Sequence, residues 1–289
     1  MIVLVTGASG QVGRSLQKVA GDYPETAFHF YDRARLDITD QAAVLQLADD
    51  LCPDYIINCA AYTAVDKAES EPERAELINS TAVAYLAKAA LEVGATLVHY
   101  SSDYVYHNGV KELLSETDPT DPQGVYARTK LQGEQQIANL GCKAIVVRTS
   151  WVYSEYGHNF VKTMLRLGRE RDQLSIVDDQ IGCPTYATDI AHATMQMIAG
   201  YPTIADHQVT INYAGAGQLS WYDFAVEIFS QSGIAIELAP IPSSDYPTPA
   251  PRPGWSVMDM RLLFDIFGIY PRPWQESLAD CIALLGPDD

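Results

Sequence analysis

The chain has 289 residues, of which 47% are hydrophobic, and it carries a formal net charge of −18. Its length suffices for one large α/β domain or for a large domain with a smaller one. The negative charge argues against nucleic acid or an anionic membrane surface as the main partner, because both would be repelled. The five cysteines form no Cys-x-x-Cys pair, which argues against a disulfide framework and a zinc knuckle.

No charged leader with an apolar segment opens the chain, and no apolar run reaches about 18 residues, the length that spans a membrane. We therefore expect a soluble, cytoplasmic protein that does not bind membranes.

Short apolar runs rich in β-branched residues alternate with helical segments. The runs lie at 2–6, 55–57, 96–100 and 144–147, and a representative helical segment at 74–92. Strands that are apolar on both faces and separated by amphipathic helices are typical of a parallel sheet covered by helices. We therefore expect an α/β fold of the doubly wound Rossmann type, with its ligand site at the carboxyl ends of the strands.

The C-terminal half is less regular. Residues 239–254 contain too many prolines for regular structure and predict an ordered loop or lid, with a disordered linker as the alternative. Helical patterns at 221–231 and 274–285 on both sides favour a loop inside a second, smaller domain.

Three glycines, Gly7, Gly10 and Gly13, follow the first apolar run and open a helix. Glycine permits a sharp turn and close backbone approach, and the free N–H groups of a helix N-terminus attract phosphate. The pattern favours a nucleotide pyrophosphate, with a plain turn between strand and helix as the alternative.

Charged residues follow the next apolar stretch, 27–31. Asp32 would accept a hydrogen bond from the ribose of NAD, whereas Arg33 or Arg35 would neutralise the 2′-phosphate of NADP. We expect NADPH as cofactor with NADH also accepted. A solvated charge cluster is the alternative.

Tyr126 and Lys130 are four residues apart on a predicted helix and therefore share one face. An ammonium group near a phenol lowers the pKa of the phenol and makes it a usable general acid or base. Ser102, at a predicted strand exit, could bind a carbonyl oxygen. An amphipathic pair and a serine turn are the alternatives.

Together these features resemble the extended short-chain dehydrogenase/reductase superfamily, which acts mainly on nucleotide sugars. Five segments are similar to those of dTDP-4-dehydrorhamnose reductases: 58–69, 99–106, 148–153, 179–185 and 246–253. The resemblance implies reduction of the C4 ketone of dTDP-4-dehydro-L-rhamnose to dTDP-L-rhamnose by NADPH or NADH. It also implies a cofactor-binding Rossmann domain at 1–150 and a mainly substrate-binding, mixed α/β domain at 151–289, with the option that the chain crosses back.

The resemblance also implies the site residues. The catalytic set is Ser102, Tyr126 and Lys130. The cofactor set is Gly7, Gly10, Gln11, Val12, Asp32, Arg33, Asp37, Ile38, Ala61, Tyr62, Thr63, Tyr100, Tyr126 and Lys130. The substrate set is Ser102, Asp103, Tyr104, Trp151 and Arg252. Asp37 and Ile38 could equally precede a helix capped by Thr39 or Asp40, Trp151 could be a core aromatic, and Arg252 could be merely exposed.

Departures from the family pattern set the remaining expectations. Some family members form dimers with magnesium held by a glutamate at the position of Ser15, so we expect no such metal site, and a monomer or weak homodimer. Trp255 replaces a usual asparagine and could reshape the substrate pocket. Tyr104 replaces the glutamate of nucleotide-sugar dehydratases, which disfavours dehydration. The alternatives are a reductase or epimerase of another nucleotide 4-keto-6-deoxy sugar and a non-catalytic regulatory subunit.

Overall fold

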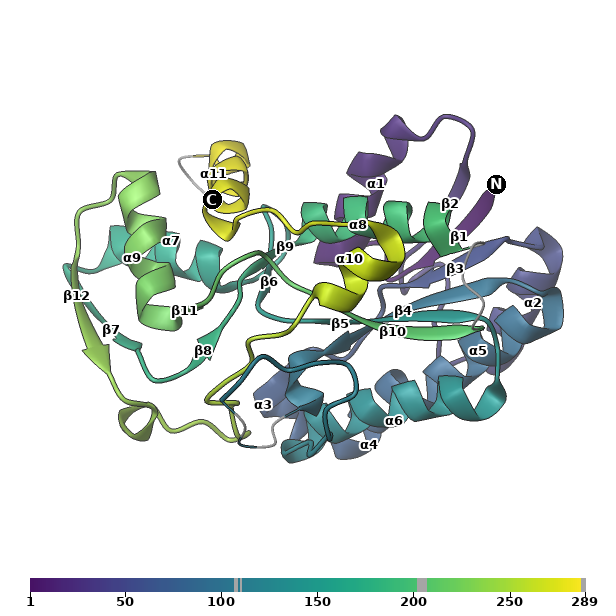
Figure 1. Cartoon of the computed structure of the whole chain (residues 1–289), viewed down its shortest axis with the longest axis horizontal. Helices are drawn as coiled ribbons and strands as arrows, with labels where there is room; N and C mark the ends of the chain where they lie inside the picture. Colours follow the sequence, from purple (N-terminus) through teal and green to yellow (C-terminus); the bar gives the residue numbers. More distant parts are fainter. Residues whose placement is uncertain (107–108, 110, 202–206, 287–289) are drawn as a thin grey trace.

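A computed structural model describes residues 1–106, 109, 111–201 and 207–286 and contains a central parallel sheet of six strands (Figure 1). The strand order is β10-β5-β4-β3-β1-β2. The strands are β1 Ile2–Thr6, β2 Ala27–Tyr31, β3 Tyr55–Asn58, β4 Thr96–Ser102, β5 Ala144–Thr149 and β10 Gln208–Tyr213. The predicted doubly wound sheet and its four apolar strands are confirmed. The order reverses between β1 and β3, which places a ligand crevice at their carboxyl ends.

Helices cover both faces of this sheet, as Figure 1 shows. One face carries α1 (Gln11–Val19), α8 (Ala187–Gly200) and α10 (Arg261–Phe267), and the other carries α2 (Gln41–Leu51), α5 (Ala82–Val93) and α6 (Gly124–Leu140). Successive side chains of a strand point to opposite faces, so Val3 and Val5 join the first core and Leu4 joins the second. This double burial explains why the strands are apolar throughout.

The predicted helix at 74–92 is interrupted. It consists of α4 (Pro72–Glu76), a π-helical turn η2 (Leu77–Thr81) and α5, and it follows the short helix α3 (Val65–Ala68). The turn packs against α6 so closely that a Cβ on Gly133 would clash with the Asn79 carbonyl oxygen. π-Helical turns occur often at functional sites, and this one brings Asn79 to the crevice.

A smaller lobe, on the left in Figure 1, has a hydrophobic core of its own. Its helices are α7 Phe160–Glu170, α9 Trp221–Ser232 and α11 Trp274–Leu284, which confirms the two predicted C-terminal helices. Its strands are β6 Val152–Tyr153, β7 Gln173–Val177, β8 Ile181–Gly182, β9 Thr185–Tyr186, β11 Leu219–Ser220 and β12 Glu237–Ile241.

The proline-rich segment is partly regular, so its prediction as a loop is wrong for residues 239–241. These residues end β12, which pairs only with β7 in a two-stranded parallel sheet. Pro240 is tolerated because an edge strand has one side without a hydrogen-bonded neighbour. A 3₁₀ turn follows at Ser243–Asp245.

The chain returns to the large lobe after its first visit to the smaller one. β10 pairs with β5, and α8 packs against α1. The division at residue 150 therefore stays a prediction. None of the helices in the described part of the chain is long and apolar enough to cross a membrane.

Candidate active site

The glycine turn joins β1 to α1 in a tight space. Gly7 has φ +66°, and a Cβ there would lie 2.5 Å from the Cys59 carbonyl carbon, at the end of the adjacent strand. A Cβ on Gly13 would lie 2.7 Å from the Ala8 Cα. Gly10 is the N-cap of α1 and makes no side-chain cap, so the first N–H groups of the helix face the crevice without a cap.

The loop after β3 supplies the opposite wall. Its Tyr62 N–H donates to the Asn79 side-chain oxygen (2.8 Å), and the Asn79 amide donates to the Tyr62 carbonyl (3.1 Å) and to Thr129 on α6 (3.2 Å). These two hydrogen bonds between the Asn79 side chain and the Tyr62 backbone hold the loop that contains Ala61 and Thr63. Sequence reasoning missed Asn79, because nothing in the spacing of an apolar helical segment marks one buried amide as a clamp.

The segment after β2 is held by its own side chains. The Asp37 carboxylate accepts from the Thr39 N–H (3.0 Å) and hydroxyl (2.7 Å), bonds that lower the pKa of Asp37. Asp40 is the N-cap of α2 and accepts from Ala43, so Asp37 and Ile38 precede the helix. The Ile38 side chain is buried in the core.

Asp32 and Arg33 lie at the carboxyl end of β2. The Asp32 carboxylate accepts from the Arg35 N–H (3.1 Å), and Arg33 pairs with Asp37 at 3.3 Å. The Arg33 side chain is 69% exposed, so its guanidinium is free to turn toward a ligand. Arg35 instead lies over the Tyr31 ring and donates to the Phe30 carbonyl.

Ser102, Asp103 and Tyr126 come together where β4 ends. The Ser102 hydroxyl donates to Asp103 at 2.9 Å and interacts with the Tyr126 hydroxyl. Burial raises the pKa of Tyr126 to about 12, against a lowering by Ser102, and the Asp103 charge adds to the increase. Burial also raises the pKa of Asp103 to about 6, and its second carboxylate oxygen has no hydrogen-bond partner.

Lys130 lies one turn after Tyr126 on α6, as predicted, but its ammonium donates to the Tyr100 carbonyl at 2.6 Å. Burial lowers the pKa of Lys130 to about 8. The expected lowering of the pKa of Tyr126 by Lys130 is wrong for this arrangement, because burial raises that pKa and Lys130 is not among the groups that shift it. The Tyr100 side chain points into the core and bonds Thr194, so only the Tyr100 backbone faces this site.

A cavity of about 980 Å³ opens beside these groups, between the two lobes. Asp103, Tyr104, Trp151 and Arg252, four of the five predicted substrate residues, line it. The fifth, Ser102, does not line the cavity but donates to Asp103, which does. The Tyr104 ring meets the Tyr126 ring edge-on at 5.4 Å, which connects the cavity to the catalytic candidates.

Trp151 lines the cavity next to residues of the smaller lobe. Its backbone has φ +47°, a strained conformation for a bulky residue, and its ring stacks on Trp221 with centroids 3.5 Å apart. A Cβ on Gly182 would lie 2.6 Å from the Trp151 ring, so only glycine fits behind it. Sequence reasoning missed Trp221, whose helical segment carried no motif.

Arg252 is held at the cavity wall by Asp66. Its guanidinium donates to the Asp66 carboxylate at 2.8 Å, and the Asp66 carboxylate also accepts from the Ala250 N–H. Asp66 lies in the family-like segment 58–69 but was not predicted as a site residue. Trp255 is not among the cavity-lining residues, since its indole donates to the Glu112 carbonyl at 2.8 Å.

The residues present fit a dinucleotide. The turn at Gly7 and Gly13 has no room for side chains, the start of α1 offers N–H groups to a diphosphate, and an exposed arginine follows β2. Within the described residues no cluster of three or more His, Cys, Asp or Glu could hold a metal ion.

A Rossmann sheet with this glycine turn, a serine at the end of β4 and Tyr126 four residues before Lys130 on α6 is the arrangement of an extended short-chain dehydrogenase/reductase. The chain belongs to the RmlD substrate binding domain family, whose model matches residues 1–286.

Three relatives agree with this placement. A dTDP-4-dehydrorhamnose reductase of Aggregatibacter actinomycetemcomitans is 42% identical over 96% of this chain and 96% of its own length. The crystal structure of a dTDP-4-dehydrorhamnose reductase of Clostridium acetobutylicum has a TM-score of 0.93 at 40% identity, covering 98% of this chain and 99% of the other. That of Bacillus anthracis, in complex with NADP, has a TM-score of 0.90 at 36% identity, covering 98% of each chain.

Proposed function

We propose that this protein reduces the C4 ketone of dTDP-4-dehydro-L-rhamnose to dTDP-L-rhamnose, with NADPH as cofactor and NADH also accepted. The observation that carries the proposal is the grouping of Ser102, Asp103 and Tyr126 beside the interlobe cavity: Ser102 donates to Asp103, which lines the cavity, and the Tyr126 ring meets that of Tyr104, which also lines it. Relatives that align along nearly the whole chain bear the name of this reductase.

The cofactor supplies a hydride when bound, and the chain supplies the proton. The phenol of Tyr126, whose pKa burial raises to about 12, is protonated at neutral pH and is the group that donates a proton to the oxygen of the ketone under reduction. Ser102 holds that oxygen by a hydrogen bond. Lys130, charged below its pKa of about 8, holds the nicotinamide ribose.

The remaining predicted residues divide between cofactor and sugar nucleotide. The diphosphate of the cofactor meets Gly7, Gly10, Gln11 and Val12 at the start of α1. Asp32, Arg33, Asp37 and the backbone of Ile38 would surround the adenosine, while Ala61, Tyr62, Thr63 and the Tyr100 backbone would line the path to the nicotinamide. Asp103, Tyr104 and Trp151 contact the sugar nucleotide, and Arg252 contacts its diphosphate.

We also propose that the protein is a monomer or weak homodimer in the cytoplasm, without nucleic-acid partners. Ser15, at the position of the family's magnesium-binding glutamate, is fully buried, 3.5 Å from the Thr188 hydroxyl. Sedimentation with and without Mg²⁺ tests this, and a dimer that forms only with the metal contradicts it.

The function is tested by NADPH oxidation with dTDP-4-dehydro-L-rhamnose. Tyr126→Phe should lower kcat by about 100-fold or more, because the proton donor is lost. The affinity for NADPH should change little. Tyr85→Phe, the same substitution on α5 away from the cavity, is the control and should keep full turnover. A wild-type protein that binds NADPH but does not oxidise it with this substrate overturns the proposal.

A further inference from the structure

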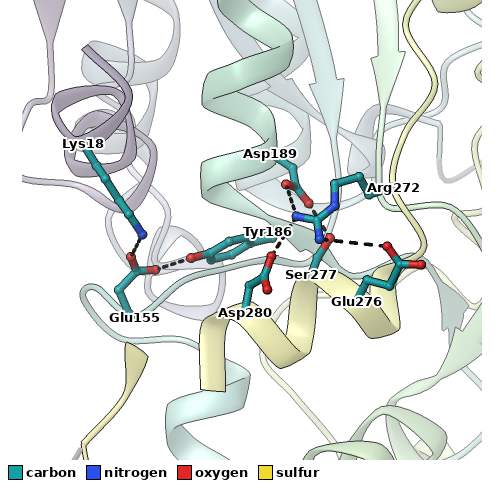
Figure 2. A network of polar contacts seen from close by, with 8 residues as sticks. All are labelled: Lys18, Glu155, Tyr186, Asp189, Arg272, Glu276, Ser277 and Asp280. Carbon is teal, nitrogen blue, oxygen red and sulfur yellow. Dashed lines mark hydrogen bonds and ion pairs between the residues drawn. The ribbon is translucent and has the colours of Figure 1, made fainter. Parts of the chain in front are cut away.

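The loop at 154–159, which leads from β6 to α7, lies along one face of α1. Gln11, Arg14 and Lys18 occupy helical positions i, i+3 and i+7 and therefore point the same way. Arg14 lies over the Tyr156 ring at 4.0 Å, and Lys18 pairs with Glu155 at 3.1 Å, a contact visible in Figure 2. Three side chains on one face of the helix thus contact one loop of the smaller lobe.

Gln11 makes the contacts nearest the cofactor crevice. Its side-chain oxygen accepts from the Ser154 hydroxyl and from the Asn159 amide, both at 2.9 Å. Its side-chain nitrogen donates to the Val152 carbonyl at 3.4 Å. A Cβ on Gly157 would lie 3.5 Å from the Gln11 Cγ, so the loop is closely packed around this side chain. The backbone of the same residue is the first of α1, beside the glycine turn.

Asn159 links the Gln11 side chain to the helix α7, which lines the cavity. It is the N-cap of α7: its side-chain oxygen accepts from the Lys162 N–H at 3.1 Å, and its carbonyl accepts from Thr163. Phe160, Thr163 and Met164 of α7 line the cavity. The amide that reaches Gln11 and the oxygen that begins α7 therefore belong to one side chain.

We propose that Gln11 is a positioning residue that sets the α7 wall of the sugar-nucleotide cavity from the cofactor side. Its side chain orients Asn159 together with the Ser154 and Tyr156 carbonyls, which accept from the same amide at 2.7 and 3.3 Å, and Asn159 fixes where α7 begins. This inference rests on the proposed function. The inference goes beyond the proposed function because it makes the shape of the cavity depend on the Gln11 side chain. That side chain is not among the cavity-lining residues, and the backbone of Gln11 belongs to the proposed cofactor site.

The test is Gln11→Met, which keeps the length of the side chain and the backbone N–H but removes both acceptor contacts. We expect the KM for dTDP-4-dehydro-L-rhamnose to rise about 10-fold, since the two hydrogen bonds that orient the wall are lost. The KM for the sugar nucleotide should rise more than the dissociation constant of NADPH, because the substitution keeps the backbone N–H of residue 11 and removes only side-chain contacts to the smaller lobe.

Two further variants sharpen the result. Asn159→Asp keeps an N-cap acceptor for α7 but loses the amide donor, and combined with Gln11→Met it should add little to the effect of either change alone. Lys18→Met is the matched control: it removes a contact between the same helix and the same loop, away from Asn159, and should leave the KM unchanged.

The outcomes separate this inference from the function itself. An active wild type whose Gln11→Met variant keeps its sugar KM overturns the inference alone, as does an equal rise in Lys18→Met. A fully additive double variant also overturns it. Absence of turnover in the wild type overturns the proposed function and the inference with it. If Gln11→Met does not fold, Ser154→Ala removes one of the two donors and should raise the KM about 3-fold, and an unchanged KM then overturns the inference.

Discussion

Burial shifts the pKa values of Tyr126 and Lys130 in opposite directions. Burial disfavours the charged form of each group, so the pKa of the phenol rises to about 12 while the pKa of the ammonium falls to about 8. At neutral pH the phenol keeps its proton and the lysine keeps its charge. Tyr126 therefore holds the proton that reduction of a ketone requires.

The alkaline limb of the pH profile should report Lys130. As pH rises through about 8, Lys130 loses its proton and charge, so kcat/KM for reduction should fall about 10-fold per pH unit above that point. Tyr126 stays protonated through this range. Initial rates at several pH values check this, and a profile that stays flat well above pH 8 would contradict it.

Arg33 should distinguish the two nicotinamide cofactors. Its side chain is exposed and held only by Asp37, so it can turn to a 2′-phosphate at little cost. Arg33→Ala should raise the KM for NADPH about 10-fold and the KM for NADH little, because a charge-assisted hydrogen bond is lost only with NADPH. Equal effects on the two cofactors would show that Arg33 does not touch the 2′-phosphate.

Short elements act by bringing side chains to the cavity. The start of α6 is set by Glu69, which accepts from the Val125 N–H at 2.6 Å, one residue before Tyr126. Gly124 has φ +82°, and a Cβ there would lie 2.7 Å from the same carboxylate. Tyr126, the proposed proton donor, is thus placed by a helix start at which glycine is strongly favoured.

The strand β8 supports the stacked indoles in the same way. Gly182→Ala would push a methyl group into Trp151 and into the Ser256 hydroxyl, which lies 2.7 Å from the added Cβ. We expect the KM for the sugar nucleotide to rise about 10-fold and the protein to lose about 1 to 3 kcal/mol of stability, the usual cost of overpacking.

Gly21→Ala provides the control for that variant. Nothing lies within 4 Å of a Cβ at Gly21, and its φ is not in the left-handed region, so alanine should be neutral there. Kinetics and urea unfolding of both variants check the prediction. A Gly182→Ala protein that behaves like Gly21→Ala would show that the Trp151 ring moves freely.

The two lobes are joined by polar contacts as well as by packing. Arg272 pairs with Asp189 on α8 at 3.3 Å and with Asp280 on α11 at 2.9 Å, and Ser277 also donates to Asp189 (Figure 2). Tyr186 on β9 donates to Glu155 at 2.9 Å, which joins the same region to α1 through Lys18. The network connects the helix that covers the sheet to the last helix of the smaller lobe.

Arg272→Met should therefore cost about 1 kcal/mol of stability, and high salt should reduce the difference from wild type. The loss of stability is moderate because water screens Arg272, which is 43% exposed. A loss is still expected because Asp189, only 11% exposed, would keep a nearly buried charge without this partner. Arg166→Met, which removes an exposed pair with Glu170 on α7, is the control and should cost less. Urea unfolding checks this, and equal costs for the two variants would contradict it.

Local sequence patterns predicted the four apolar strands, the glycine turn after the first of them, and the shared helix face of Tyr126 and Lys130. These features depend on hydrophobic period, turn residues and helix geometry within a few positions, so they can be predicted from one chain. The family-like segments added the catalytic and substrate candidates, four of which line one cavity.

Only the tertiary structure decided the contacts between distant parts of the chain. Gln11 meets Asn159 across 148 positions, Arg252 meets Asp66 across 186, and Trp151 stacks on Trp221. The packing of two cores and the return of β10 to the sheet place these side chains, and no local pattern encodes such distances. Burial likewise decided the pKa of Tyr126, because the removal of water around the phenol disfavours its charged form.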